Sequence, residues 1–222
     1  MNNSRITKFS KIIIWCVVVV SSLHIFFNLL LANILTTAFE SEAITDYTFN
    51  YFVALLSEGS YFLGLIKVFF IFVSHILLSK WFYTSCKLNH LNDVKGLETS
   101  ARWAWLWYAI PIAALIKPYQ SLEETYKASF QKEDWEEIPV PWVFPIWWLS
   151  WIVSNFLGNR SANQFFDLTE ETLYENWVTY YYTVSAFDLI NIVSALALLQ
   201  IVKTISKNQS KLNFDINYTI RK

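Results

Sequence analysis

The sequence predicts an all-α integral membrane protein with four transmembrane helices, a short tryptophan-rich segment and two amphipathic surface helices. Three observations lead to this fold class: the apolar composition, four long apolar runs and the distribution of lysine and arginine. Of the 222 residues, 55% are hydrophobic and 16% are charged, and the mean hydropathy is +0.32. Soluble domains carry about 25% charged residues, so this composition argues against a soluble protein. The net charge of −1 gives no support for nucleic-acid binding.

Four runs are long enough to cross a bilayer, which takes roughly 20 predominantly apolar residues. They cover residues 12–36, 61–83, 142–159 and 178–202. The first run is longer than the apolar core of a signal peptide, which has about 7–15 residues, so we expect an uncleaved signal anchor. The runs define a membrane domain over residues 12–205, with an N-terminal end at 1–11 and a polar tail at 206–222.

Residues 103–116 form a shorter apolar segment that is rich in tryptophan. As a helix it would span roughly 21 Å at about 1.5 Å per residue, whereas the hydrocarbon core is about 30 Å thick. Pro111 would also interrupt its backbone hydrogen bonding. We therefore expect a re-entrant or interfacial segment, with a fifth membrane crossing as the alternative.

Lysine and arginine decide between four and five crossings, because these residues accumulate in cytoplasmic loops. With four spans and both termini inside, 15 of these cations lie in the cytoplasm, Arg160 lies outside and Lys67 lies in the membrane. With five spans the division becomes 8 to 8. The charge distribution therefore predicts four spans with both termini cytoplasmic.

Two stretches outside the runs carry apolar stripes with helical spacing. The first predicts a helix over residues 119–130 on the cytoplasmic surface, with an apolar face of Tyr119, Leu122, Tyr126 and Phe130. Ser121 and Glu124 have the spacing of a capping box near its start. The second predicts an interfacial helix on the outer side, with a stripe of Phe49, Phe52, Val53 and Leu56.

A set of motif residues in the middle of the chain resembles a known family. They are Trp81, Tyr83, Asn89, Trp103, Pro111, Lys117, Pro118, Tyr119, Gln120 and Ser129. The most specific part is the run 117–120 after a Pro-Ile pair, followed by Lys-Ala-Ser at 127–129. Together these residues resemble the bacterial multi-span membrane proteins that contain domain of unknown function 4328, over roughly residues 11–209. The resemblance implies an integral membrane protein and implies no known activity.

Four polar residues interrupt the apolar runs and are the candidate site: Lys67, Asp188, His24 and His75. In the four-span topology Lys67 and Asp188 lie at the same depth, so we expect them to form an ion pair, because each charge alone is costly in lipid. The alternative for Lys67 is that its long side chain reaches the outer headgroups. The histidines fit hydrogen-bonded packing in the bundle, a proton relay or, with Asp188, part of a metal site.

The sequence predicts neither catalytic residues nor a metal or cofactor, and it contains none of the common catalytic or nucleotide-binding motifs. The leading hypothesis is a non-enzymatic structural, regulatory or partner-binding component of a bacterial inner membrane. The alternatives are a small transporter or channel component with a polar path through the four candidate residues, and then a membrane enzyme. The expected partners are the lipid bilayer and either another protein or a second copy of the chain.

Overall fold

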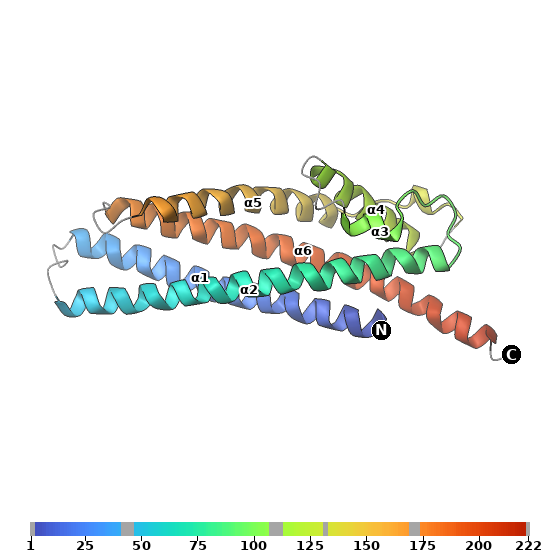
Figure 1. Cartoon of the computed structure of the whole chain (residues 1–222), viewed down its shortest axis with the longest axis horizontal. Helices are drawn as coiled ribbons and strands as arrows, with labels where there is room; N and C mark the ends of the chain where they lie inside the picture. Colours follow the sequence, from blue (N-terminus) through green and yellow to red (C-terminus); the bar gives the residue numbers. More distant parts are fainter. Residues whose placement is uncertain (1–2, 41–46, 107–112, 131–132, 169–173, 221–222) are drawn as a thin grey trace. The chain divides into compact units, whose positions relative to one another are not determined.

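The computed structural model describes residues 3–40, 47–106, 113–130, 133–168 and 174–220, and these residues contain helices and no β-strand. Six α-helices follow one another along the chain (Figure 1): α1 Asn3–Glu40, α2 Tyr47–Leu91, α3 Ala101–Leu106, α4 Lys117–Ala128, α5 Val143–Asp167 and α6 Tyr174–Ile220. Two short 3₁₀ turns, η3 Ala113–Leu115 and η4 Trp135–Glu137, lie between them. The all-helical fold class is therefore confirmed for the described residues.

Three of the helices are long and apolar enough to cross a membrane, among the residues that the structure describes. The relevant stretches are Ser4–Ala38 in α1, Tyr51–Leu91 in α2 and Glu175–Lys211 in α6. The remaining predicted run, residues 142–159, lies mostly in α5. This helix is not among the three, and serine, asparagine and arginine side chains interrupt its apolar sequence.

The chain divides into two compact units, to which α1, α2, α5 and α6 each contribute. Unit 1 consists of Met1–Trp15, Phe72–Trp148 and Leu196–Lys222. Unit 2 consists of Cys16–Ile71 and Leu149–Ala195.

In unit 2, the segments of α1, α2, α5 and α6 run alternately up and down. Along α1, His24 contacts Asp188 of α6, and eight residues later Ala32 packs near Tyr181, so the two helices are antiparallel. Helices α1 and α2 are also antiparallel. His24 contacts Lys67, and Asn28, which is later in α1, contacts Ser60, which is earlier in α2. The segment of α5 is antiparallel to α6, since Gly158 lies near Phe187 and Phe165 lies near Tyr180.

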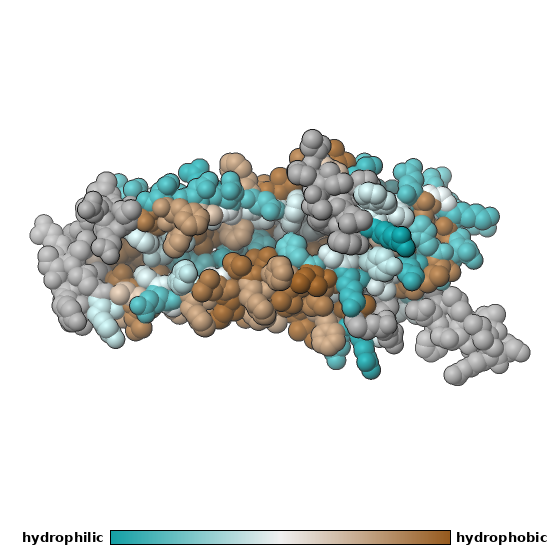
Figure 2. Space-filling view, in the orientation of Figure 1, coloured by the Kyte–Doolittle hydropathy of each residue, from teal (hydrophilic) through white to brown (hydrophobic). Residues whose placement is uncertain are grey.

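Unit 2 has polar residues inside and large apolar residues outside. Its buried polar side chains include Ser21, His24, Asn28, Ser60, Lys67, Ser154, Ser185 and Asp188. Its exposed side chains include Phe26, Phe62, Leu65, Val68, Phe69, Phe156 and Leu189. Apolar residues gather over α2 in the space-filling view (Figure 2). A water-soluble domain shows the opposite arrangement, because its large apolar side chains form the core.

In unit 1, α4 packs its apolar face against the start of α5. Leu122 and Tyr126 are buried, and the Tyr126 ring lies edge-on to fully buried Phe144 with a centroid distance of 5.0 Å. Tyr119 is half-buried against the same phenylalanine, while Phe130 is 36% exposed. The predicted helix is therefore present, and Leu122 and Tyr126 of its predicted apolar face are buried, but the assignment of Phe130 to that face is wrong, because it lies beyond the end of the helix and is exposed.

The predicted capping box of this helix is wrong. The helix begins at Lys117, with Pro118 in its first turn, where a missing backbone N–H costs no hydrogen bond. Glu124 instead accepts hydrogen bonds from the backbone N–H groups of Glu98 and Thr99 and from the Thr99 hydroxyl. The carboxylate therefore fixes the loop that follows α2 rather than the start of its own helix.

The predicted interfacial helix at residues 49–56 is not a separate element, because α2 runs without a break from Tyr47 to Leu91. Val53 and Leu56 pack against a small core of Leu31, Ala32 and Tyr181, while Phe52 is exposed. Gly59 stands between this stripe and the following apolar run, but the helix continues through it, so the two predicted helices join.

We expect the packing of α4 to stabilise the protein through Leu122, which is 2% exposed. Replacing a buried leucine by alanine costs about 2–5 kcal/mol, so Leu122→Ala should lower the melting temperature of the purified full-length protein in detergent by several degrees. The matched control is Gln120→Ala on the exposed side of the same helix. Equal melting temperatures for the two variants would contradict this packing.

Candidate functional site

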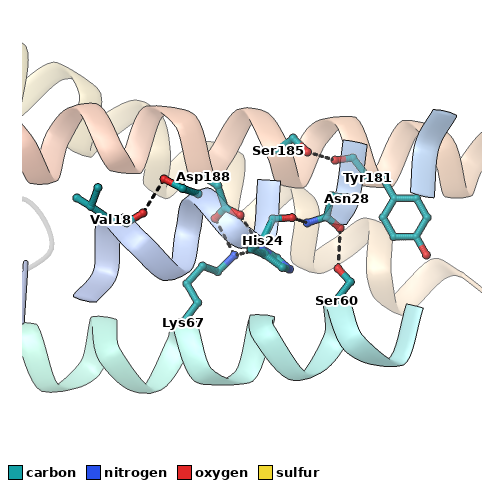
Figure 3. Close-up of polar contacts among 9 residues, drawn as sticks. Val18, His24, Asn28, Ser60, Lys67, Tyr181, Ser185 and Asp188 are labelled. Carbon is teal, nitrogen blue, oxygen red and sulfur yellow. Dashed lines mark hydrogen bonds and ion pairs between the residues drawn. The ribbon is translucent and has the colours of Figure 1, made fainter. Parts of the chain in front are cut away.

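The candidate site is a buried charged cluster in unit 2 that joins α1, α2 and α6 (Figure 3). Lys67 Nζ lies 2.7 Å from Asp188 Oδ1, and His24 Nδ1 lies 2.6 Å from Asp188 Oδ2. Lys67 Nζ and His24 Nδ1 are 3.0 Å apart. The predicted ion pair between Lys67 and Asp188 is therefore present, and His24 completes a triangle that the sequence did not predict.

All three side chains are almost fully removed from solvent: Asp188 is 0%, Lys67 5% and His24 6% exposed. Each comes from the inward face of a long helix, so three separate helices must keep their register for the triangle to form. A buried carboxylate needs donors for both oxygens, because burying a charge without a partner is costly. Here each oxygen has one nitrogen partner, and the two partners come from different helices.

Two distributions of protons fit these distances. In the first, the Lys67 ammonium and the Nδ1–H of a neutral His24 each donate to one oxygen of the Asp188 carboxylate. In the second, an imidazolium donates from Nδ1 to Oδ2 and toward the neutral Lys67 amine, which donates to Oδ1. The carboxylate is ionised and the total charge is zero in both. The geometry therefore allows one proton to reside on either lysine or histidine.

Two further contacts shape the surroundings of the cluster. Lys67 Nζ lies 5.0 Å from the centre of the Phe187 ring, so the ring face can stabilise the ammonium. Gly64, one turn before Lys67, leaves room for the imidazole, because a Cβ atom there would lie 3.4 Å from His24 Nε2. That distance is an ordinary van der Waals contact, so the imidazole packs directly against this glycine.

A second polar link lies one turn along α1. Ser60 Oγ donates to Asn28 Oδ1 over 3.0 Å, and Asn28 Nδ2 donates to the backbone oxygen of His24 over 2.8 Å. Sequence reasoning missed Ser60. Ser60 lies seven residues before Lys67, a spacing that places both side chains on one face of α2 and that could have identified it.

His75 does not belong to the cluster. It lies on an exposed face of α2 in the segment assigned to unit 1. The combination of His24, His75 and Asp188 as metal ligands is therefore not formed. Throughout the described part of the chain, no group of three histidine, cysteine, aspartate or glutamate side chains is arranged to hold a metal ion.

Unit 1 has a separate polar network, built from neutral side chains. Gln209 Nε2 donates to Asn89 Oδ1 over 2.9 Å and to the backbone oxygen of Ser85, while Asn89 Nδ2 donates to the backbone oxygen of Thr125. Asn208 Nδ2 donates to Ser129 Oγ over 3.1 Å. These bonds connect α2, α4 and α6. Two of the residues that they join, Asn89 and Ser129, are predicted motif residues.

The other motif residues divide between packing and an open cleft. Trp81 is 1% exposed and donates from Nε1 to Ser206 Oγ, and Pro118 is buried at the start of α4. Tyr83 and Tyr119 are half-buried. A cleft of about 680 Å³ is lined by Trp103, Lys117 and Gln120 together with carboxylates that include Glu123 and Glu136. Pro111 lies outside the described residues.

We expect the charges of the cluster to be energetically coupled. Lys67→Met or Asp188→Leu alone should destabilise the protein by about 3–5 kcal/mol, because each leaves a buried charge without its partner. The double variant should lose less than the sum of the two losses, by at least about 1 kcal/mol. Thermal unfolding of the full chain in detergent measures all four proteins, with Asn191→Ala as a control on α6. Additive losses would show that the ion pair contributes nothing.

Comparison with known proteins identifies a family and no relative of known structure or function. No curated protein and no solved structure matches the chain. The family model described as domain of unknown function 4328 matches residues 54–207 of the chain. This range includes the predicted motif residues, Lys67 and Asp188. It leaves out His24 and Asn28 of α1 and Asn208 and Gln209 of α6. The chain is therefore a member of the family with domain of unknown function 4328.

Proposed function

We propose that the protein is a four-span integral membrane component without catalytic activity, whose charged cluster holds the helices of unit 2 in register. The observation that carries the proposal is the inverted distribution of side chains in that unit. Large apolar residues cover its surface, whereas ionic, amide and hydroxyl groups lie inside. Lipid is the solvent that suits such a surface, since in water an apolar patch of this extent would drive association.

The direction of the helices supports four crossings. The contacts within unit 2 make its four segments alternate in direction, as a chain that crosses a bilayer four times must do. Polar residues interrupt α5, but this helix has 25 residues and so extends over roughly 37 Å, enough for a hydrocarbon core of about 30 Å. It contacts α6 at Gly158, and Val153 and Phe156 are exposed.

The distribution of charge supports cytoplasmic termini. Fifteen of the 17 lysine and arginine residues belong to unit 1, and unit 2 holds only Lys67 and Arg160. The cations that the four-span topology places inside are therefore gathered in one unit, which agrees with the positive-inside orientation. By the same rule we propose that residues 87–102 and 117–141 face the cytoplasm of a bacterial inner membrane.

The structural role of the cluster is supported by its closed geometry. Both carboxylate oxygens of Asp188 are bound to nitrogens of the chain, and the nitrogens are themselves in contact. Groups that are committed to each other in this way fix helix positions, whereas a catalytic group must also reach a substrate. We propose that the protein acts through partners in the membrane, either another protein or a second copy of the chain.

Accessibility of single cysteines tests the orientation. With Cys16 and Cys86 replaced by serine, we expect Glu133→Cys to be protected from an impermeant maleimide in intact cells and labelled after the membrane is opened. Asn163→Cys, on the exposed face of α5, should be labelled from outside. Labelling of position 133 from outside would overturn the four-span proposal in favour of five spans.

A second candidate function is proton-coupled transport, and one observation favours it. The Lys67, His24 and Asp188 triangle accommodates a proton on two different groups at the same total charge. Ser21 Oγ, one turn before His24 in α1, is buried without a hydrogen-bond partner among the described residues, so it could hold a water molecule next to the triangle. Intramembrane histidine and carboxylate groups are the usual elements of a proton relay.

Proton flux separates the two candidates. In liposomes with a pH gradient and an internal pH-sensitive dye, we expect the purified protein to leave the decay rate within about twofold of that of protein-free liposomes. Asp188→Asn, which keeps the size of the side chain, should then show the same rate. A faster decay for the wild-type protein that returns to the background rate in Asp188→Asn would establish the transport function instead.

A further inference from the structure

A cleft in unit 1 collects four lysines from the two ends of the chain. It has a volume of about 540 Å³ and lies between the first turns of α1 and the last part of α6. Lys8 and Lys11 line it from α1, and Lys203 and Lys207 line it from α6. The spacings of three and four residues place each pair on one face of its helix, so the four ammonium groups surround the same space.

Among the side chains that the structure describes, no carboxylate lines this cleft. Its other lining residues are Ser4, Thr7, Ile12, Trp15, Ser206 and Ser210. Within the described residues, no aspartate or glutamate forms an ion pair with any of the four lysines. Like charges held this close repel one another, and a bound anion relieves the repulsion. The four lysines, without acidic neighbours, therefore favour a ligand with at least one negative charge.

Hydroxyl groups form the floor between the two helices. Thr7 Oγ1 and Ser206 Oγ lie 3.2 Å apart, and Ser206 Oγ also accepts a hydrogen bond from Trp81 Nε1 over 3.1 Å. These contacts hold α1 and α6 at a fixed separation. The lysine ammonium groups therefore lie on the walls of the cleft, and the contacts of Thr7 and Ser206 fix its base.

One end of the cleft is apolar. Ile12 and Trp15 follow the lysines along α1 and are 47% and 48% exposed. A free inorganic anion cannot bind favourably to such an apolar surface, whereas a lipid presents a charged phosphate next to its acyl chains. Indole rings also favour the headgroup level of a bilayer. The order of lysines and then apolar residues along one helix therefore matches the order of groups in a phospholipid.

We propose that this cleft binds the phosphate group of an anionic phospholipid, with the acyl chain against Ile12 and Trp15. The inference goes beyond the proposed function, because the cleft shares no residue with the charged cluster of unit 2. It rests on insertion of the protein in a membrane but not on the role of Lys67, His24 and Asp188. Its failure would leave the coupling and flux experiments unaffected.

Native mass spectrometry of the full chain in detergent tests the proposal. Bound lipid is counted while phosphatidylglycerol, phosphatidylcholine or inorganic phosphate is titrated. We expect phosphatidylglycerol to bind at least about tenfold more tightly than phosphatidylcholine, because one ammonium near an anionic lipid contributes about fivefold in affinity. Inorganic phosphate should bind at least about tenfold more weakly than phosphatidylglycerol, since it lacks the apolar chain.

Variants locate the site. Lys203→Ala with Lys207→Ala should weaken phosphatidylglycerol binding at least about tenfold, and so should Lys8→Ala with Lys11→Ala on the opposite wall. The matched control is Lys80→Ala with Lys87→Ala, which removes two exposed lysines of α2 outside the cleft and should change binding less than about twofold. Unchanged melting temperatures without added lipid establish that the variants are folded.

Three results would overturn the proposal. Equal losses in the control and cleft variants would show a general effect of charge. Equal affinities for phosphatidylglycerol and phosphatidylcholine would remove the role of the net negative charge. Inorganic phosphate bound as tightly as the lipid would show that Ile12 and Trp15 take no part.

Discussion

The buried carboxylate of Asp188 is the constraint on which unit 2 depends. It is completely removed from solvent, so its charge must be balanced by groups of the chain. Lys67 and His24 supply these groups from two other helices, at 2.7 and 2.6 Å. A rotation or shift of any one of the three helices would break at least one of these contacts. The carboxylate therefore selects a single register for α1, α2 and α6.

This constraint matters more in an apolar solvent than in water. Between helices in lipid there is little hydrophobic driving force, because acyl chains are as apolar as leucine, so packing and polar contacts decide which faces meet. In unit 2, Gly64 and Gly158, which have no side chain, lie against His24 and Phe187, and the Asn28–Ser60 hydrogen bond adds a second link. The polar interior and the apolar exterior are thus two consequences of one arrangement.

Unit 1 uses a different set of interactions. Its helices are joined by amide and hydroxyl groups, chiefly Gln209, Asn89 and Ser129, which need no counter-charge. These neutral groups form hydrogen bonds with one another and do not require the lysines of this unit as partners, so the lysines can bind other groups at the surface. That division gives unit 1 a cationic cleft beside a neutral interior, whereas unit 2 neutralises the buried charge of Asp188 with its own Lys67 and His24.

Composition and periodicity by themselves determined the helical fold class, the amphipathic face of 119–130 and the pairing of Lys67 with Asp188. These follow from local spacing and from the cost of a lone charge in an apolar run. The sequence could not reveal the third partner, His24, or the Asn28–Ser60 bond, because the rotation of each helix decides which residues of neighbouring helices meet. It also misassigned Glu124, whose spacing from Ser121 fits a cap. Only the tertiary structure brought the loop at Glu98 and Thr99 within reach of that carboxylate, and loop N–H groups without helical partners bind it more readily.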